Sequence, residues 1–342
     1  MMRKIVLLFV CVVMPLAAWS QGAKVTLNGA GATFPYPMYS KWFSEYNKVH
    51  PEVQINYQSI GSGGGIRQVT EGTVEFGASD MPMTDDQLKE AESKLKTKVF
   101  NLPTVLGAVV PAYNIPGVSG DVKFTGDILA GIFLGRIANW NDPAIAKINP
   151  EIKFPSQDII VVHRSDGSGT TFIWTDYLSK VSSEWKSQVG SNTSVKWPKG
   201  LGGKGNEGVA GSIRQLPGSI GYVELIYALQ NKIPYGSVKN SAGEFMKASL
   251  EGVTAAAASA PKMPADFRVS ITNAPGKEAY PISSFTWLLV PAQSKDAAKG
   301  KILADFLNWM ATEGQKMTNS LAYAPLPDSV AAKEKDAIKM VK

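Results

Sequence analysis

Cysteine is almost absent from this chain of 342 residues, and histidine is scarce. The one cysteine, Cys11, lies in the first twenty residues, and the two histidines are His50 and His163. Without a pair of cysteines the chain has no disulfide to use, so its stability must come from packing. So few cysteine and histidine residues also provide no cluster of the kind that holds zinc. We therefore expect no metal site and no cofactor.

Long apolar runs are missing too, except at the start of the chain. Arg3 and Lys4 precede an apolar stretch at residues 5–16, and small residues follow up to Ser20. This order is typical of a cleavable secretory signal, and the stretch is shorter than the roughly 20 residues that a membrane-spanning helix needs. We predict a signal peptide at residues 1–20 and a periplasmic location for the exported protein.

The chain also lacks clusters of basic residues with interleaved aromatic residues, which are typical of nucleic-acid binding. It has 35 Lys and Arg residues against 29 Asp and Glu residues, a net charge of +6. Without Arg3 and Lys4 of the expected signal peptide, 33 basic residues face 29 acidic ones, and the net charge is +4. This modest, dispersed excess suits a small anion, and we expect no nucleic-acid partner.

Short β-rich runs, such as those at 53–57 and 159–162, alternate with helical stretches along the chain. This alternation predicts an α/β protein with mainly parallel sheets flanked by helices. The 342 residues minus the 20 of the signal leave 322, which is more than one ordinary core holds, so we expect two lobes. Apolar residues at helical spacing over 39–46 and 303–310 are expected to face the core.

Glycine, serine and threonine gather in three turns, at 29–34, 61–65 and 164–170, and a helical pattern follows each one. The first N–H groups of a helix are unpaired and carry a partial positive charge, so a helix start can hold an anion. Each segment alone is weak evidence, because such residues are common in ordinary turns. Together they favour an oxyanion site. Segment 61–66 lacks the last glycine of GxGxxG, and 202–205 lacks the Lys-Ser/Thr of a P-loop, which disfavours a nucleotide.

Three charged residues refine this hypothesis. Arg164 is the only full positive charge in the three segments, and its planar fork can donate two hydrogen bonds to one oxyanion. Asp166 is close enough to orient Arg164, although a surface ion pair in a turn would leave the same pattern. Asp80 lies between a strand and a helix, where an N-cap or Asx-turn role is the ordinary alternative. A carboxylate cannot donate a hydrogen bond, so Asp80 fits an anion site only if the anion carries a proton.

Ser168 lies in a Gly-Ser-Gly segment that superficially resembles the nucleophile of a hydrolase. A GxSxG elbow needs glycine where this chain has Asp166. His163 precedes Arg164 on an expected strand, so the two side chains should face opposite ways. We therefore expect no enzyme, and a phosphatase or hydrolase that uses Ser168 remains an alternative.

Several ordered segments resemble the phosphate-binding subunit of bacterial phosphate ABC transporters, the PstS family. They include GAGATFPYPMYSKW from Gly29, IGSGGGIRQ from Ile60, FGASDMPM from Phe76, RSDGSGTTFIWTDYL from Arg164 and LAYAPLP from Leu321. The resemblance implies a periplasmic-binding-protein fold of type II, in which two α/β lobes are joined by two crossover strands. Lobe I is then expected at 21–104 plus 281–342, lobe II at 105–280, and the crossovers at 105–113 and 283–290.

The resemblance also implies a ligand, a single inorganic phosphate ion, and its contacts. The implied contacts are the backbone N–H groups of Thr33 and Phe34, together with Ser62, Asp80, Arg164, Ser168, Gly169 and Thr170; Asp166 would orient Arg164.

Membrane permease subunits of an ABC transporter are the implied partners, and the protein is expected to be a monomer before docking. Alternatives are a binder of sulfate, molybdate or another tetrahedral oxyanion, against which Asp80 argues, and an adhesive surface protein that merely keeps the two lobes.

Overall fold

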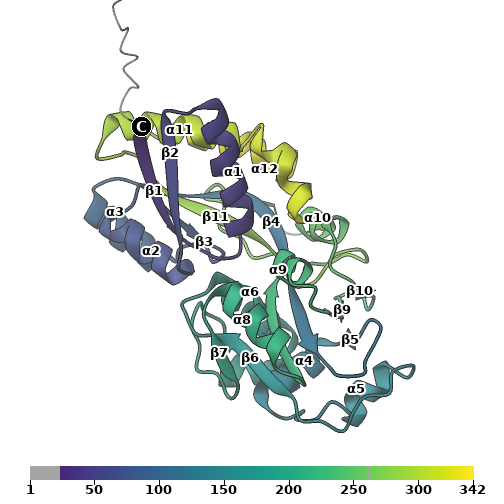
Figure 1. The fold of residues 1–342 in the computed structure, drawn as a ribbon. Helices are drawn as coiled ribbons and strands as arrows, with labels where there is room; N and C mark the ends of the chain where they lie inside the picture. Colours follow the sequence, from purple (N-terminus) through teal and green to yellow (C-terminus); the bar gives the residue numbers. More distant parts are fainter. Residues whose placement is uncertain (1–23, 260–261) are drawn as a thin grey trace, which may run out of the picture.

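The computed structural model describes residues 24–259 and 262–342, so the expected signal peptide at 1–20 lies outside the described residues. Its main feature is a sheet of eight strands in the order β2-β1-β3-β11-β4-β8-β6-β7. Helices cover both halves of this sheet (Figure 1), which confirms the expected α/β class. Within the described residues, no helix is long and apolar enough to span a bilayer.

The first half of the sheet belongs to one lobe, drawn at the top of Figure 1. Its strands β1 (Val25–Gly31), β2 (Val53–Ser59) and β3 (Phe76–Ser79) are parallel, and β11 (Ser283–Pro291) runs antiparallel to β3. The helices of this lobe are α1 (Tyr36–Val49), α2 (Ser62–Glu71), α3 (Asp85–Leu95), α11 (Ala297–Met310), the 3-10 helix η1 (Gly314–Leu321) and α12 (Asp328–Ile338).

The second lobe holds the other half of the sheet, with β6 (Ile160–Arg164) parallel to β7 (Leu201–Gly203) and to β8 (Ser219–Glu224). Its helices are α4 (Gly126–Leu134), α5 (Pro143–Ile148), α6 (Gly169–Val181), α7 (Ser183–Gln188), α8 (Gly205–Gln215) and α9 (Leu225–Gln230). Helix α10 (Leu250–Ser259) packs against β11 and β4, where the two halves meet. A small second sheet joins β5 (Lys123–Phe124), β9 (Ser237–Lys239) and β10 (Phe245–Met246).

The long strand β4 (Val99–Asn114) connects the two halves. Residues 99–108 pair with β11, and residues 109–114 pair with β8, so the expected crossover at 105–113 spans the point where the partner changes. The expected crossover at 283–290 lies within β11, which pairs with strands of the first half only. The chain returns from the second half to the first just before β11 begins. There the Val109 N–H of β4 donates to the Ile282 carbonyl at 2.9 Å. The division of the chain between the lobes stays a prediction.

The core explains why the site segments meet. The helical stripes at 39–46 and 303–310 are mostly buried, as expected, and they fix α1 and α11 on the first half of the sheet. Because β1, β2 and β3 are parallel, the segments that follow them emerge at the same edge. Arg164 ends β6 at the corresponding edge of the second half. The segments around Thr33, Ser62, Asp80 and Arg164 therefore converge between the lobes.

Candidate anion-binding site

Helix starts from both lobes supply unpaired backbone donors. The residues concerned are Thr33 and Phe34 before α1, Ser62 at the start of α2, and Thr170 in the first turn of α6. Their N–H groups donate to no other group within the described part of the chain, and all four residues are buried. Buried N–H groups are nearly always paired in folded proteins. These four are therefore candidate donors to a bound anion.

Ser62 joins the two lobes through a single oxygen atom. Its Oγ accepts the N–H of Asp80 at 3.1 Å and the N–H of Gly169 at 3.0 Å. A side chain at position 169 would not fit, because its Cβ would lie 2.5 Å from the Asp80 Cβ and 2.5 Å from Ser62 Oγ. Beside this contact, the N–H of Gly63 donates to the carbonyl of Gly167 at 2.9 Å. The lobes are thus closed on each other around the candidate site.

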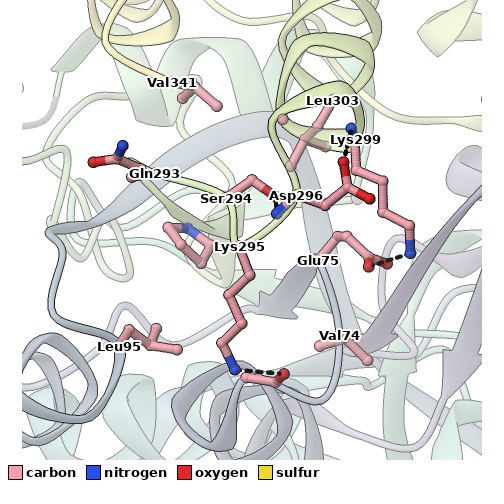
Figure 2. Close-up of a pocket in the computed structure, with 13 residues that line it drawn as sticks. Val74, Glu75, Leu95, Gln293, Ser294, Lys295, Asp296, Lys299, Leu303 and Val341 are labelled. Atoms are coloured by element: carbon pink, nitrogen blue, oxygen red, sulfur yellow. Dashed lines mark hydrogen bonds and ion pairs between the residues drawn. The ribbon is translucent and has the colours of Figure 1, made fainter.

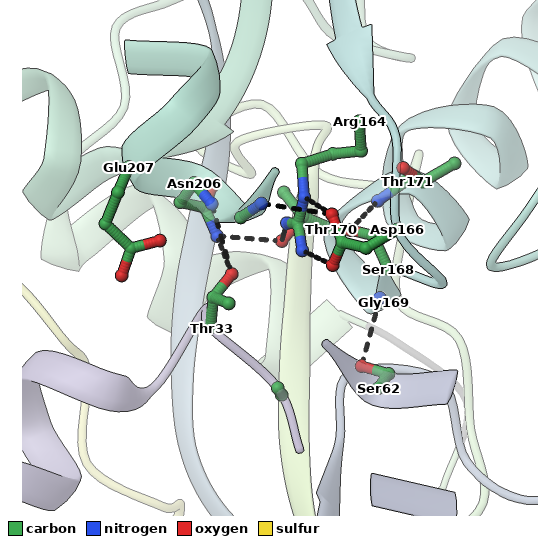
Figure 3. A network of polar contacts seen from close by, with 12 residues as sticks. Thr33, Ser62, Arg164, Asp166, Ser168, Gly169, Thr170, Thr171, Asn206 and Glu207 are labelled. Carbon is green, nitrogen blue, oxygen red and sulfur yellow. Dashed lines mark hydrogen bonds and ion pairs between the residues drawn. The ribbon is translucent and has the colours of Figure 1, made fainter. Parts of the chain in front are cut away.

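Arg164 is held by Asp166 in a two-pronged ion pair (Figure 3). Arg164 Nε donates to Oδ1 of Asp166 at 2.8 Å, and Nη2 donates to Oδ2 at 2.5 Å. The Arg164 side chain is only 1% exposed, so this pair is not the surface ion pair that was the alternative. Burial opposes ionisation of Asp166, but the hydrogen bonds and charge of Arg164 outweigh it and keep the pKa of Asp166 below its ordinary value. The carboxylate therefore stays charged and fixes the guanidinium.

The guanidinium of Arg164 still has donors to offer. It carries five N–H groups. Two of them bind Asp166, and a third, on Nη1, donates to Thr170 Oγ1 at 3.4 Å. Two N–H groups, one on each terminal nitrogen, therefore remain for an anion in the site.

Asp80 places a carboxyl group among these donors. The residue is 1% exposed, and its Oδ1 accepts the hydroxyl of Thr286, from β11, at 2.7 Å. Burial raises the pKa of Asp80 to about 7, although the Thr286 hydrogen bond and the charge of Arg164 oppose the shift. The N-cap alternative does not hold, since Thr84 caps α3 and accepts the Gln87 N–H at 3.3 Å. Asp80 is instead a buried acid of the site, fixed by the hydrogen bond that it accepts from Thr286.

Sequence reasoning missed three residues that complete the site. Asn206 donates through Nδ2 to the hydroxyls of Thr33 and Thr170 (Figure 3). Tyr227 donates to the carbonyl of Thr33 at 2.5 Å, and Thr286 binds Asp80. A signal for Asn206 did exist. It follows the glycine-rich turn at 202–205 and lies at the start of α8, which is the arrangement seen in the three predicted segments.

Ser168 has no catalytic partner. Its Oγ accepts the Thr171 N–H at 3.0 Å and so caps α6, and it has no hydrogen bond to a histidine or acid among the described residues. His163 faces away, as expected, and stacks on Trp197 with ring centroids 4.7 Å apart. Among all the described residues, no three His, Cys, Asp or Glu side chains are grouped as the ligands of a metal ion would be. The geometry suits binding and gives no support to nucleophilic chemistry.

A separate pocket of about 130 Å³ lies on the first lobe beside the start of α11 (Figure 2). Its charged residues already have partners. Lys299 pairs with Glu75 at 2.8 Å, Lys295 Nζ donates to the Gly72 carbonyl at 3.4 Å, and Asp296 caps α11. This pocket therefore does not compete with the interlobe site as an anion site.

The fold and the site define a class: a two-lobed binding protein whose closed lobes bury a site rich in hydrogen-bond donors. A family model described as "PBP superfamily domain" matches residues 18–313. Among curated proteins, the phosphate-binding protein PstS of Xylella fastidiosa (strain Temecula1) is 49% identical over 91% of this chain and 84% of its own length. That of Pasteurella multocida is 46% identical over 90% and 88%, and that of Methanocaldococcus jannaschii is 40% identical over 93% and 87%.

Solved structures agree on the fold. A periplasmic phosphate-binding protein, PfluDING, solved with phosphate bound, is 22% identical with a TM-score of 0.73 and matches 91% of this chain and 93% of its own. The phosphate binding protein of Stenotrophomonas maltophilia is 18% identical with a TM-score of 0.71, over 91% and 93%. The chain belongs to the PBP superfamily and, within it, to the PstS family.

Proposed function

We propose that this protein binds one inorganic phosphate ion between its lobes and delivers it to the permease subunits of an ABC transporter. Membership of the PstS family supports the ligand, because the curated relatives are named as phosphate-binding proteins. The proposed location is the periplasm, and the proposed state before docking is a monomer. The proposed lobes are residues 21–104 plus 281–342 and residues 105–280.

The observation that carries the proposal is the combination of many donors with one buried acid. The proposed contacts are Thr33, Phe34, Ser62, Asp80, Arg164, Ser168, Gly169 and Thr170, all of which are buried. Hydrogen bonds from these donors stabilise an anion that has lost its water shell, so its charge need not be fully neutralised by positively charged side chains. A site for a fully deprotonated anion would gain nothing from a carboxylate, since lone pairs would face lone pairs. Asp80 therefore points to an anion that can share a proton with it.

Phosphate meets this requirement at neutral pH, and sulfate does not. In the proposed complex, Asp80 accepts a hydrogen bond from the P–OH group while Arg164 and the helix starts donate to the other oxygens. A site built around such a bond rejects an analogue that lacks it by about 10⁴-fold or more in comparable cases. Arsenate has the shape and protonation of phosphate, so discrimination against it should be weak.

Closure of the lobes couples binding to delivery. A ligand shifts a conformational equilibrium only through different affinities for the two states. The proposed contacts lie on both lobes, so the ion binds the closed state more tightly than an open one. The permease would then receive a closed, loaded protein and must favour opening to release the ion.

A calorimetric titration of phosphate-stripped protein with phosphate tests the proposal. We expect one saturable site per chain, and X-ray scattering should show a more compact particle when phosphate is present. The absence of binding heat at any phosphate concentration up to the millimolar range would contradict the proposed function. Steady turnover of a phosphate ester that is lost in Ser168→Ala would point instead to a hydrolase.

A further inference from the structure

Asn206 is a fully buried amide whose orientation is determined by its neighbours. Its Oδ1 accepts the backbone N–H of Glu224 at 2.9 Å. A peptide N–H can only donate, so the oxygen of the amide must face Glu224 and the nitrogen must face the opposite side. On that side lie the hydroxyls of Thr33, from the first lobe, and Thr170, from the second.

Thr33 Oγ1 accepts two hydrogen bonds from Asn206, one from the backbone N–H at 3.3 Å and one from Nδ2 at 2.8 Å. A hydroxyl has two acceptor lone pairs and one proton. With both lone pairs occupied, the Thr33 hydroxyl can only donate to a third group. In the closed structure the polarity of this hydroxyl is therefore set by Asn206.

Thr170 Oγ1 is in the same situation. It accepts from Asn206 Nδ2 at 3.2 Å and from Arg164 Nη1 at 3.4 Å. Ser62 Oγ likewise accepts two backbone N–H groups, from Asp80 and Gly169. The proton of Ser62 is directed to the Asp80 carboxyl group, whereas the hydroxyls of Thr33 and Thr170 are left with a proton that a ligand rich in acceptors, such as phosphate, can use.

We propose that Asn206 is a positioning residue, which acts by forcing the hydroxyls of Thr33 and Thr170 to donate towards the ligand. This inference rests on the proposed function, because it explains how the site is prepared for phosphate. Asn206 acts through the two threonines and needs no contact with the ion. Since Thr33 and Thr170 lie on different lobes, the Asn206 contacts also link donor orientation to lobe closure.

A mutant cycle measured by phosphate calorimetry tests this role. The proteins are wild type, Asn206→Leu, the double variant Thr33→Val/Thr170→Val, and the triple variant that combines them. We expect Asn206→Leu alone to weaken phosphate binding by about 10- to 100-fold, through two misoriented donors. In the valine background the hydroxyls are gone, so Asn206→Leu should weaken binding by less than about threefold or even improve it.

A purely structural role for Asn206 would give the same loss in both backgrounds, and that result would overturn the inference. Asn149→Leu is the matched control, because Asn149 is also a fully buried amide of the second lobe, and it binds Lys123 and Ile145 away from the site. Its phosphate affinity should equal that of the wild type.

Two further outcomes of the mutant cycle have a defined interpretation. If Asn206→Leu does not fold, judged by circular dichroism and thermal melting, Asn206→Ala replaces it in both backgrounds with the same expected pattern. If wild type itself shows no phosphate binding, the proposed function fails and this inference fails with it. Wild-type binding with equal losses in both backgrounds overturns the role of Asn206 alone.

Discussion

The hydroxyl oxygen of Ser62, on α2, accepts the backbone N–H of Gly169, on α6, at 3.0 Å. The two residues are 107 positions apart in the sequence and lie on different lobes. The same oxygen accepts the N–H of Asp80, so one side-chain atom ties the candidate acid to the helix start opposite. Closure of the lobes and assembly of the site are therefore one event.

A methyl group at position 169 should prevent this event. In Gly169→Ala, the added Cβ would meet Asp80 and Ser62 at 2.5 Å, and these atoms belong to the opposite lobe. Overpacking of this kind costs about 1–3 kcal/mol, so we expect phosphate affinity to fall by about 10- to 100-fold. Calorimetry measures the loss, and scattering should show a smaller change in shape on addition of phosphate.

Gly211→Ala is the control for that variant. Gly211 lies within α8, and no neighbouring group is within 4 Å of the position that a Cβ would occupy there. Alanine at this position should leave phosphate affinity unchanged and stabilise the protein by about 0.5–1 kcal/mol. Equal phosphate affinities for Gly169→Ala and Gly211→Ala would show that the lobes need not meet at Gly169.

Replacement of Arg164 by lysine retains the positive charge and removes the planar guanidinium group with its several N–H donors. Lysine cannot bind Asp166 through two parallel hydrogen bonds and also donate to a ligand. We expect Arg164→Lys to weaken phosphate binding by about 100-fold, since hydrogen bonds to charged groups contribute about 1.5–3 kcal/mol each. The control is Arg136→Lys, because Arg136 pairs with Glu184 at an exposed position. Should both variants bind phosphate like wild type, charge alone would explain the role of Arg164.

The raised pKa of Asp80 should make the phosphate-free protein less stable as the pH rises. The carboxyl has an ordinary pKa of 3.8, and burial raises it to about 7 in the folded protein. Between these values the folded protein binds more protons than the unfolded chain, so the free energy of unfolding falls with increasing pH. The loss is fully developed above pH 7 and amounts to at most about 4 kcal/mol.

Urea unfolding of wild type and Asp80→Asn between pH 4 and pH 8 measures this effect. Asparagine does not titrate, so the stability of wild type should fall relative to the variant across this range. Other buried acids, such as Glu224 and Glu334, act equally in both proteins and cancel in the difference. Parallel stability curves would mean that Asp80 is not buried in the phosphate-free protein.

Sequence patterns predicted the fold and the segments of the site, but not how the lobes meet. Periodicity identified α1 and α11, and the glycine-rich turns identified the helix starts because their chemistry is local. Asn206 escaped because its role depends on contacts with Thr33 and Thr170, which are 173 and 36 positions away. Thr286 escaped for the same reason, since only the sheet order brings β11 beside β3 and Asp80. The glycine-rich turn at 202–205 marked the segment of Asn206, but contacts between residues so far apart have no signature in a single sequence.

Asp80 is the residue on which the choice of phosphate over other oxyanions depends. Asparagine at this position can donate a hydrogen bond, which removes the need for a proton on the ligand. Asp176→Asn is the matched control, because Asp176 is a partly buried acid that also accepts hydroxyl hydrogen bonds, from Ser270 and Thr272, but lies outside the site.

The most direct test of this selectivity is the ratio of phosphate to sulfate affinity, measured by calorimetry at neutral pH in wild type, Asp80→Asn and Asp176→Asn. We predict a ratio of about 10⁴ or more in wild type and in Asp176→Asn, and a ratio lower by at least about 100-fold in Asp80→Asn. Equal affinities for the two anions in wild type, or an unchanged ratio in Asp80→Asn, would contradict the proposed role of Asp80.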